Sequence, residues 1–406
     1  MKRHRLLFLF VALATCFAAG GHAAEAPDSL QSVRDASLPT DLTASIMVVT
    51  PGTNFTAGFG HCALHVTCLS AGLDRCFSFG LKDSFASVVN ILTKGYCDGH
   101  YDCVPTDLFV EPYARQGRGI TEYGLNLSLE EIRLLWMNLD NETLRPAGHP
   151  YTFIHAHCSS TLINILQRSL IGENIRYGAL GEEFSEDYRH LMFRMMQQMP
   201  WAQFASTTIM AAEGERKATI PELLTPNLVE ETWGDAVLEG SDGCRPLLTG
   251  EKRELLPLIT IPKAGALTPV RVFAALLVLT VLLTLAQWLL RWRRGAHIYD
   301  GILLGVHTLV SVLIVYLVFF SLASWSGGGM MAWVFNPLPF VACLCLRRVR
   351  WSRWLWLLLA LVLLFFCVCW KQFPQLLPAH VLLFLTFAIR CLSASFSKTD
   401  KQKEKI

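Results

Sequence analysis

The sequence predicts two parts of different fold class: an exported α+β domain, followed by an all-α domain of five membrane-spanning helices. Three observations predict this division. The chain starts like a signal peptide, residues 24–262 have the mixed composition of a soluble domain, and nearly every long apolar run lies between residues 270 and 393. The net charge of +2 is close to zero, so nothing indicates nucleic-acid binding.

Residues 1–23 are predicted to be a signal peptide. The start Met1–Arg5 is basic, and the apolar stretch Leu6–Ala19 follows it. Small residues then provide a cleavage site after Ala23 or Ala24. We therefore expect the domain that follows to fold outside the cytoplasm.

Strands are predicted near the start of the exported domain. Ser45–Thr50 alternates and is β-branched, Gly58–Val66 is entered through glycines, and Cys76–Leu81 is a third strand. Side chains two residues apart on a strand share a face, so His61 and His65 lie on one face of the second strand.

Two helices are predicted further along. Leu129–Leu139 has Ser128 as its N-cap, and Glu131 completes a capping box. Thr161–Leu170 follows an extended aromatic segment, which places Cys158 at or near a helix N-terminus. The helix dipole and the free N–H groups at that position favour a thiolate.

Cys158 and His61 together fit nucleophilic cysteine chemistry. A histidine facing a thiol takes its proton and later returns it to the leaving group. The backbone N–H of Cys158 is a candidate donor to the oxyanion that forms during such a reaction.

Other interpretations of these residues stay open. A strand histidine beside glycines is more often structural, and an isolated cysteine is more often a disulfide partner or a core residue. The spacing of His61, Cys62, His65 and Cys68 also contains zinc-ligand types. On a strand, however, Cys62 points away from the two histidines, and an exported compartment favours disulfides. We therefore expect no metal and no cofactor.

The exported domain keeps seven cysteines, so at least one thiol is unpaired if disulfides form. Cys97 and Cys103 flank a short loop and are candidates for a disulfide.

Five apolar runs are predicted to be membrane-spanning helices. Most reach the roughly 20 residues that cross a bilayer. The third is the weakest, because Asn336, Pro337 and Pro339 interrupt it. Few charges lie inside the runs, so they lack the pattern of an ion relay. The runs lie at about residues 270–290, 302–323, 330–346, 353–370 and 379–395.

Basic clusters follow the first, third and fifth runs, whereas the opposite loops carry Lys371 alone. By the positive-inside rule the basic loops face the cytoplasm, which places the N-terminal domain outside. The signal peptide requires the same orientation. We therefore predict a transmembrane domain at residues 263–396 and a basic cytoplasmic tail at residues 397–406.

Several short motifs, in their order and spacing, resemble the Lnb-type lipoprotein N-acyltransferases. In the exported domain they are Pro51-Gly52, Phe59-Gly60-His61-x-Ala63-Leu64, Phe77-Ser78-Phe79-Gly80, Gly117-Arg118, Thr121-Glu122, Leu125-Asn126-Leu127, Tyr151 to Cys158, and Met199-Pro200-Trp201. In the membrane half they are Asp300-Gly301-Ile302-Leu303-Leu304 and Trp333-x-x-Asn336-Pro337-Leu338.

The resemblance implies a permuted papain-like (NlpC/P60-type) exported domain, in which the histidine strand precedes the cysteine helix. It also implies a periplasmic acyltransferase of the cytoplasmic (inner) membrane with no cofactor. Such an enzyme moves a fatty acyl chain from a phospholipid, through a cysteine thioester, to the α-amino group of the lipidated N-terminal cysteine of a lipoprotein. Cys158 would be the nucleophile and His61 the general base and acid. The partners would be a phospholipid donor and a diacylated lipoprotein acceptor.

The sequence departs from the family around the cysteine. The family usually has Asp-Asn before it and Thr-Thr-Arg after it, where this chain has Ala156-His157 and Ser159-Ser160-Thr161. The third, orienting residue is therefore open, with His65 and Ser78 as candidates. His157 is a candidate contact for the oxyanion, or a neighbour without a role.

Arg118 and Glu122 fit another family motif. An internal salt bridge is the favoured role for such residues, and binding of the phospholipid phosphate by Arg118 is the alternative. Arg118, Glu122 and His157 are thus the candidate substrate-binding residues.

Two other functions compete with acyl transfer. One is a cell-wall amidase or peptidase that uses the same cysteine and histidine, and the other is a non-catalytic lipid- or partner-binding membrane protein. A soluble peptidase would not need five helices, which favours the acyltransferase. Residues 206–262 carry no recognisable chemistry and are predicted to link the domain to the first helix.

Overall fold

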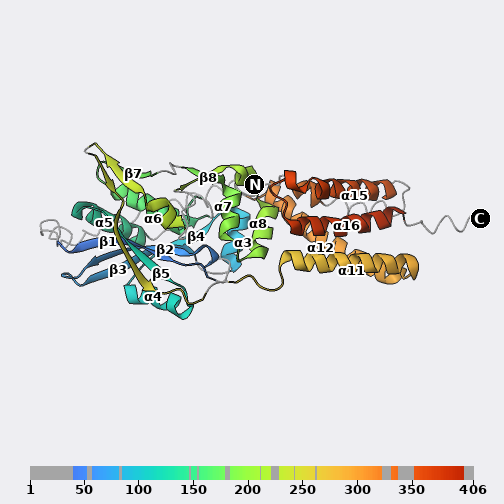
Figure 1. Cartoon of the computed structure of the whole chain (residues 1–406), viewed down its shortest axis with the longest axis horizontal. Coiled ribbons are helices and arrows are strands. Elements are labelled where there is room, and N and C mark those ends of the chain that lie inside the picture. Colours follow the sequence, from blue (N-terminus) through green and yellow to red (C-terminus); the bar gives the residue numbers. More distant parts are fainter. Residues whose placement is uncertain are drawn as a thin grey trace, which may run out of the picture. The chain divides into compact units, whose positions relative to one another are not determined.

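A computed structural model describes most of the chain (Figure 1). The predicted signal peptide, the basic tail and most of the third predicted membrane helix lie outside the described residues. Those described from Asp41 onward belong to one compact unit. The described residues are 40–52, 57–81, 85–145, 148–152, 155–178, 183–210, 212–220, 228–241, 243–260, 263–321, 331–336 and 352–396.

The N-terminal domain is built on an antiparallel sheet of seven strands, in the order β12-β5-β1-β2-β3-β4-β6 (Figure 1). All three predicted strands are confirmed, as β1, β2 and β3. The strands are β1 (Leu42–Val49), β2 (His61–Cys68), β3 (Leu73–Leu81), β4 (Cys97–Val104), β5 (Ile120–Leu125), β6 (His149–Tyr151) and β12 (Leu248–Leu256).

Helices cover both faces of this sheet. α5 (Leu129–Leu144) and α6 (Cys158–Ser169) pack on one face, where Cys62 and Leu64 of β2 belong to the main hydrophobic core. α4 (Thr106–Arg115) packs on the other face, against Ala63 and neighbouring residues of β1 and β3. The alternation of β2 therefore divides its side chains between two cores, as predicted.

The capping box of α5 is confirmed. Ser128 accepts a hydrogen bond from the Glu131 backbone, and the Glu131 carboxylate accepts one from the Ser128 backbone. Such a cap is worth about 1 kcal/mol of helix stability. The box fixes where the α5 helix begins.

Cys97 and Cys103, predicted to flank a loop, lie instead on the single strand β4. A strand rises about 3.3 Å per residue, so residues six apart are about 20 Å apart. A disulfide requires Cα atoms within about 7 Å. The proposed pairing is therefore wrong, and both cysteines are free thiols.

Residues 206–262 do not merely link the domain to the membrane helices, so that prediction is wrong too. Leu248–Leu256 forms the edge strand β12, which pairs with β5, and Trp233 is buried in the main core. The segment also supplies strands of two smaller sheets, β11-β10-β7 and β8-β9. Its elements, with their partners, are β7 (Glu173–Tyr177), β8 (Glu183–Asp187), β9 (Lys217–Thr219), α10 (Val229–Trp233), β10 (Ala236–Gly240) and β11 (Gly243–Pro246).

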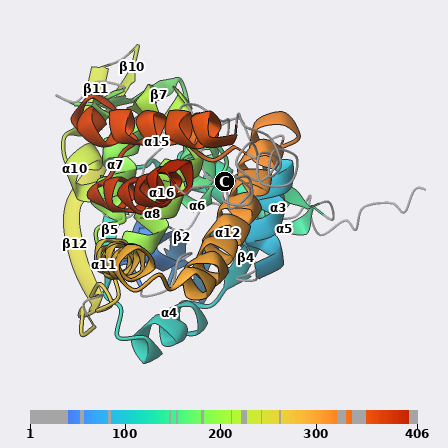
Figure 2. The same ribbon diagram turned by 90° about the vertical axis from the view of Figure 1, so that its right-hand side faces the viewer.

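The C-terminal half is helical and apolar (Figures 1 and 2). Of the helices in the described residues, three are long and apolar enough to cross a membrane: Pro269–Leu289, Arg294–Phe319 and Pro378–Phe396. A shorter apolar helix covers Arg353–Val368. Four of the five predicted runs are thus confirmed as helices. The elements are α11 (Pro269–Leu289), α12 (Arg293–Phe319), α13 (Met331–Val334), α15 (Ser352–Val368) and α16 (Pro378–Phe396).

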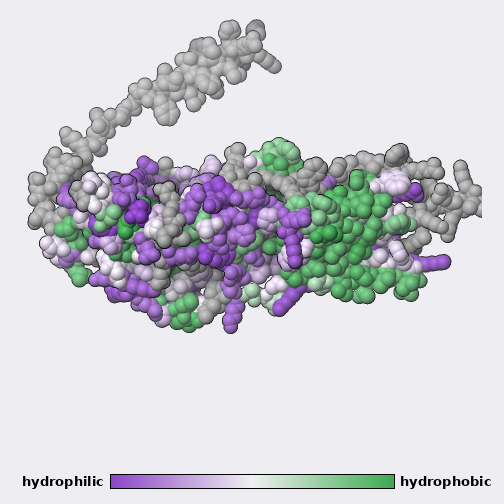
Figure 3. All heavy atoms as spheres, turned by 45° about the horizontal axis from the view of Figure 1, so that its top comes forward, coloured by the Kyte–Doolittle hydropathy of each residue, from purple (hydrophilic) through white to green (hydrophobic). Residues whose placement is uncertain are grey.

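α16 packs against both α15 and α11. On the face seen in Figure 3, apolar side chains cover the surface of these helices, whereas hydrophilic side chains dominate the N-terminal domain. An outward-facing apolar surface is the arrangement that a lipid environment requires.

A polar cluster joins these helices, which the scarcity of charges in the runs did not predict. The Arg390 guanidinium donates from Nε and Nη2 to the two Asp300 carboxylate oxygens, at 2.6 and 2.7 Å. It also donates to Thr284 at 2.8 Å and to Gln287 at 3.0 Å. The cluster therefore ties α11, α12 and α16 together.

Helix α8 (Pro200–Ile209) contacts the helical half. Trp201 donates from its indole N–H to the Leu267 carbonyl at 2.7 Å. Thr208 lies 3.0 Å from His380 Nε2, and the Phe204 ring stacks on the His380 imidazole. These contacts link the two halves of the chain.

Candidate active site

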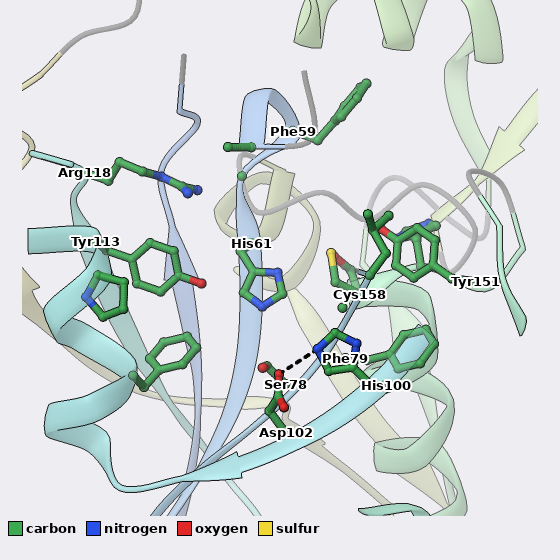
Figure 4. Close-up of a pocket in the computed structure, with 18 of the residues that line it drawn as sticks. Phe59, His61, Ser78, Phe79, His100, Asp102, Tyr113, Arg118, Tyr151 and Cys158 are labelled. Atoms are coloured by element: carbon green, nitrogen blue, oxygen red, sulfur yellow. Dashed lines mark hydrogen bonds and ion pairs between the residues drawn. The ribbon is translucent and has the colours of Figure 1, made fainter. Parts of the chain in front are cut away.

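A pocket of about 490 Å³ opens where β2, β3 and β4 meet α4 and the first turn of α6 (Figure 4). Its volume is within the range of small-molecule sites. Five of the seven predicted site residues line it: His61, Ser78, Arg118, His157 and Cys158.

Cys158 is the first residue of α6, and His157 is the N-cap. The His157 N–H donates to the Ser160 hydroxyl at 3.0 Å, which fixes the start of the helix. The backbone N–H of Cys158, as the first of the helix, has no carbonyl acceptor within it. The predicted placement of the cysteine is confirmed.

The surroundings of the Cys158 thiol favour its protonated form. Burial raises its pKa, and this effect outweighs the Ser159 hydroxyl and the nearby backbone N–H groups of Cys62 and Ser159, which lower it. The helix start therefore does not lower the pKa of Cys158 overall, as its position alone predicts, because desolvation disfavours the anion more than the helix terminus favours it.

His61 lies between Tyr113 and Cys158 (Figure 4). Its ring packs near the Phe109 and Tyr113 rings, with centroids 6.3 and 6.4 Å away. Burial, together with the charge of Arg118 and the nearby His100, lowers the pKa of His61 to about 4. The imidazole is therefore neutral at pH 7 and able to accept a proton.

A neutral thiol and a neutral imidazole that line one pocket suit general-base catalysis. The imidazole removes the thiol proton as the sulfur attacks, so no thiolate has to exist beforehand. The pair therefore needs an electrophile close to both groups, with a cavity to hold it.

Arg118 lies on the side of His61 away from Cys158 (Figure 4). α4 ends at Arg115, and two residues later Gly117 has a φ of +66°, which suits glycine and turns the chain so that Arg118 faces the pocket. The guanidinium Nε donates to the Thr50 carbonyl at 2.7 Å, and the Arg118 side chain stacks on Tyr113. Nη2 is buried and has no hydrogen-bond partner among the described residues. A buried cation with an unused donor, at the wall of a cavity, is a place where an anion would bind.

The rest of the pocket wall is largely apolar. Aromatic and aliphatic side chains from η1 (Ala57–Phe59), β3, β4, α4 and α7 (Tyr188–Met195) line it beside the polar groups. Such a wall accommodates an apolar chain while the polar groups hold its reacting end. The apolar lining residues include Phe59, Phe79, Leu81, Val104, Leu108, Phe109 and Met192.

Two family models match the chain: the Lnb N-terminal periplasmic domain over residues 30–192, and the Lnb transmembrane domain over residues 261–402. The chain belongs to the Lnb family. The resemblance noted in the sequence is thus confirmed across both halves.

Other comparisons add little. No curated protein gives a significant match. Among solved structures, the type VI secretion system effector TseH is similar at 12% identity, over 53% of this chain and 98% of that chain. The TM-score of 0.27 is too low to support any conclusion about fold or function.

Lnb membership supports a role of the lipoprotein N-acyltransferase type, in a membrane protein whose N-terminal domain is periplasmic. The predicted α+β domain followed by apolar helices is confirmed. In this Lnb protein the histidine strand precedes the cysteine helix and the two meet at one pocket, which agrees with the permuted papain-like arrangement.

Two predicted site residues lie outside this pocket. His65 Nδ1 is 2.6 Å from Glu122, and its Nε2 is 2.9 Å from Asp74. Burial lowers the pKa of His65, but these carboxylates outweigh burial and raise it. Glu122 also accepts a hydrogen bond from Ser45. His65 and Glu122 therefore form an internal ion pair of the Lnb domain, and neither lines the pocket with Cys158.

His100 and Asp102 were not singled out from the sequence, although both line the pocket. They lie on β4, whereas the sequence predicts a loop between Cys97 and Cys103. The alternation of Asp98, His100 and Asp102 is the signal that could have found them, since it places all three on one face of a strand.

Among the described residues, no three His, Cys, Asp or Glu side chains come together as a metal site would need. Cys62 belongs to the core on the α6 side of the sheet, as the sequence predicts for a strand residue adjacent to His61.

Proposed function

We propose that this protein moves a fatty acyl chain from a phospholipid to the α-amino group of the lipidated N-terminal cysteine of a lipoprotein, through a thioester on Cys158. The main supporting observation is that Cys158, at the start of α6, and His61 line one apolar-walled pocket in a chain with membrane-type helices. The acyl chains of both substrates lie in the bilayer, so a membrane-anchored site suits them.

In the first half-reaction, the Cys158 sulfur attacks the ester carbonyl of the phospholipid. His61 takes the thiol proton and then gives it to the departing glycerol oxygen. A carbon–sulfur bond forms, an ester carbon–oxygen bond breaks, and lysophospholipid leaves. The Cys158 backbone N–H would donate to the oxyanion.

In the second half-reaction, the neutral amine of the diacylated lipoprotein attacks the thioester. A carbon–nitrogen bond forms and the carbon–sulfur bond breaks. His61 carries an amine proton to the sulfur, which restores the resting thiol. The product is an amide, and the enzyme returns to its starting state.

Arg118 would hold the phosphate of the phospholipid donor. Its unused guanidinium N–H is a donor for a phosphate oxygen. Ser78 stays a candidate for orienting His61, and His157 for contacting the oxyanion, since both line the pocket.

The proposed topology follows the charge pattern of the sequence. After removal of the signal peptide, the N-terminal domain lies in the periplasm, the helices span the inner membrane, and the C-terminus lies in the cytoplasm.

To test this, the full chain is expressed in cells that lack their own N-acylating enzyme. The mass of the N-terminal peptide of a lipoprotein is then measured by mass spectrometry. The wild-type chain is expected to add one acyl group. Cys158→Ser and His61→Ala are expected to lower this by about 10³-fold or more. Cys244→Ser, which replaces an exposed thiol outside the pocket, is the matched control.

Two results would contradict the proposal in different ways. If only the diacyl form persists with the wild-type chain, acyl transfer is excluded, and hydrolysis of cell-wall peptides becomes the next activity to assay. If both pocket variants keep full activity, the function survives but the cysteine mechanism does not.

A further inference from the structure

The chemistry of the acceptor poses a requirement that Cys158 and His61 do not meet alone. An N-terminal α-amino group has a pKa of about 7.7–8.0, so it is mostly an ammonium ion at pH 7. An ammonium nitrogen loses two protons before it becomes an amide nitrogen. One proton returns to the Cys158 sulfur through His61, and the other has to reach water before the amine attacks.

The strand register provides a second histidine level with His61. On β3 and β4, Gly80 pairs with His100 and Ser78 pairs with Asp102. Ala63 of β2 pairs with Ser78, and extending this register by two residues puts His61 level with Gly80. His61, Gly80 and His100 therefore form one row across three strands, on the face that carries the pocket.

Gly80 leaves the space between the two histidines open. A Cβ built on Gly80 would meet no atom within 4 Å. The row thus has an imidazole at each end and a gap between them that is wide enough to admit a substrate group. Both histidines and Gly80 line the pocket.

His100 and Asp102 form a pair with access to water. His100 Nε2 lies 3.2 Å from the Asp102 carboxylate, and their side chains are 41% and 50% exposed. Asp102 is the one carboxylate among the described residues that line the pocket. His61 lies between these two residues and Arg118 (Figure 4). The pocket therefore has a cation on one side of His61 and an anion on the other.

We propose that His100 and Asp102 form the acceptor subsite, which binds the ammonium group of the incoming lipoprotein and passes its first proton to water. This inference rests on the proposed function. The opposite charges on the two sides of His61 would separate the substrates, with the phosphate of the donor at Arg118 and the ammonium of the acceptor at Asp102.

The steps balance. The ammonium group docks on the Asp102 carboxylate, and His100 accepts one proton and releases it to water. The neutral amine then attacks the thioester carbon, and the carbon–sulfur bond breaks. His61 takes the second proton from the nitrogen and delivers it to the Cys158 sulfur.

The experiment separates the two half-reactions in the purified full chain. Lysophospholipid release and the intact mass of the acyl-enzyme report the first, and acylation of a synthetic diacylated lipopeptide with a free N-terminus reports the second. Asp102→Asn and His100→Gln are expected to leave acyl-enzyme formation within about twofold of wild type. Transfer to the lipopeptide is expected to fall about 10- to 50-fold, as for loss of one charged hydrogen bond.

A pH profile adds a readout that general damage to the fold would not produce. The transfer defect of Asp102→Asn is expected to shrink above about pH 8, where the amine is neutral in solution and no longer depends on the subsite for deprotonation. Asp98→Asn is the matched control, because Asp98 is an exposed aspartate on the same strand outside the pocket lining.

Three results would overturn the inference. If Asp102→Asn slows acyl-enzyme formation as much as transfer, the pair positions His61 and does not bind the amine. If neither half-reaction changes, the pair has no part in catalysis. If the wild-type chain forms no acyl-enzyme at all, the proposed function fails and the subsite fails with it.

Discussion

Two buried arginines, one in the pocket and one among the membrane helices, differ in how many hydrogen-bond partners compensate for the burial of their charge. Arg118 and Arg390 are almost equally inaccessible, at 5% and 6% exposure. Arg390 is held by both oxygens of Asp300 and by the side chains of Thr284 and Gln287. Arg118 donates to one backbone carbonyl, and its Nη2 has no partner among the described residues.

From this difference we infer a structural role for Arg390 and a ligand-binding role for Arg118. Taking a guanidinium out of water costs several kcal/mol, and a carboxylate with further hydrogen bonds offsets that cost. Arg390 has all of these partners, so its position is explained by the packing of α11, α12 and α16. Arg118 has too few, so we infer that a ligand completes its site.

The largest expected effect comes from removing one of the hydrogen-bond partners of Arg390. Asp300→Asn leaves Arg390 as an uncompensated buried cation. We expect the free energy of unfolding to fall by about 3 kcal/mol, at the low end for a broken buried ion pair because Asp300 is 37% exposed. Denaturant titration of the full chain in detergent measures this loss.

The matched control for stability is Glu251→Gln, which neutralises an exposed carboxylate on β12. It should shift the unfolding midpoint very little. If Asp300→Asn lowers the free energy of unfolding no more than Glu251→Gln does, the Arg390 cluster contributes nothing to stability. The two arginines would then not differ in the way we infer.

An intermediate effect is expected from Arg118→Gln, on activity and not on stability. The rate of acyl-enzyme formation should fall by about 10- to 50-fold, as for loss of one charged hydrogen bond to the donor phosphate. The free energy of unfolding should stay level or rise, because the substitution removes a poorly compensated buried charge. Lysophospholipid release and denaturant titration test the two halves of this prediction.

Arg118→Lys refines the comparison. It keeps the charge but loses the planar fork, so its activity should lie between those of Arg118→Gln and wild type. If both Arg118 variants are less stable than wild type but equally active, Arg118 has a structural role and not a ligand-binding one.

The smallest expected effect is on the pH profile. Acyl-enzyme formation needs neutral His61, whose pKa is lowered to about 4, first by burial and then by Arg118 and His100. The rate should therefore hold as the pH falls below 6 and decline only near pH 4. Removing the positive charge makes imidazolium less unfavourable, so Arg118→Gln should move this decline to higher pH. Rates between pH 3.5 and pH 7 would measure the shift, and the same profile in both proteins would contradict it.

The comparison also shows what could be predicted from the sequence. The helices, the strand of His61 and the start of the Cys158 helix follow from local patterns, because apolar periodicity and capping residues act over a few neighbouring positions. Arg390 was not singled out, because a charge within an apolar run has no local signature that names its partner on another helix.

The sequence by itself therefore determined the two-part architecture, the membrane helices, and the placement of Cys158 and His61 on their elements. Only the tertiary structure decided which side chains share the pocket. Because β4 pairs with β3, His100 and Asp102 line the pocket. His65 instead contacts the carboxylates of Asp74 and Glu122. Burial also raises the pKa of the Cys158 thiol, against the effect expected from the helix start alone. The physical reason is that strand pairing and desolvation depend on residues far apart in the chain, which local periodicity does not record.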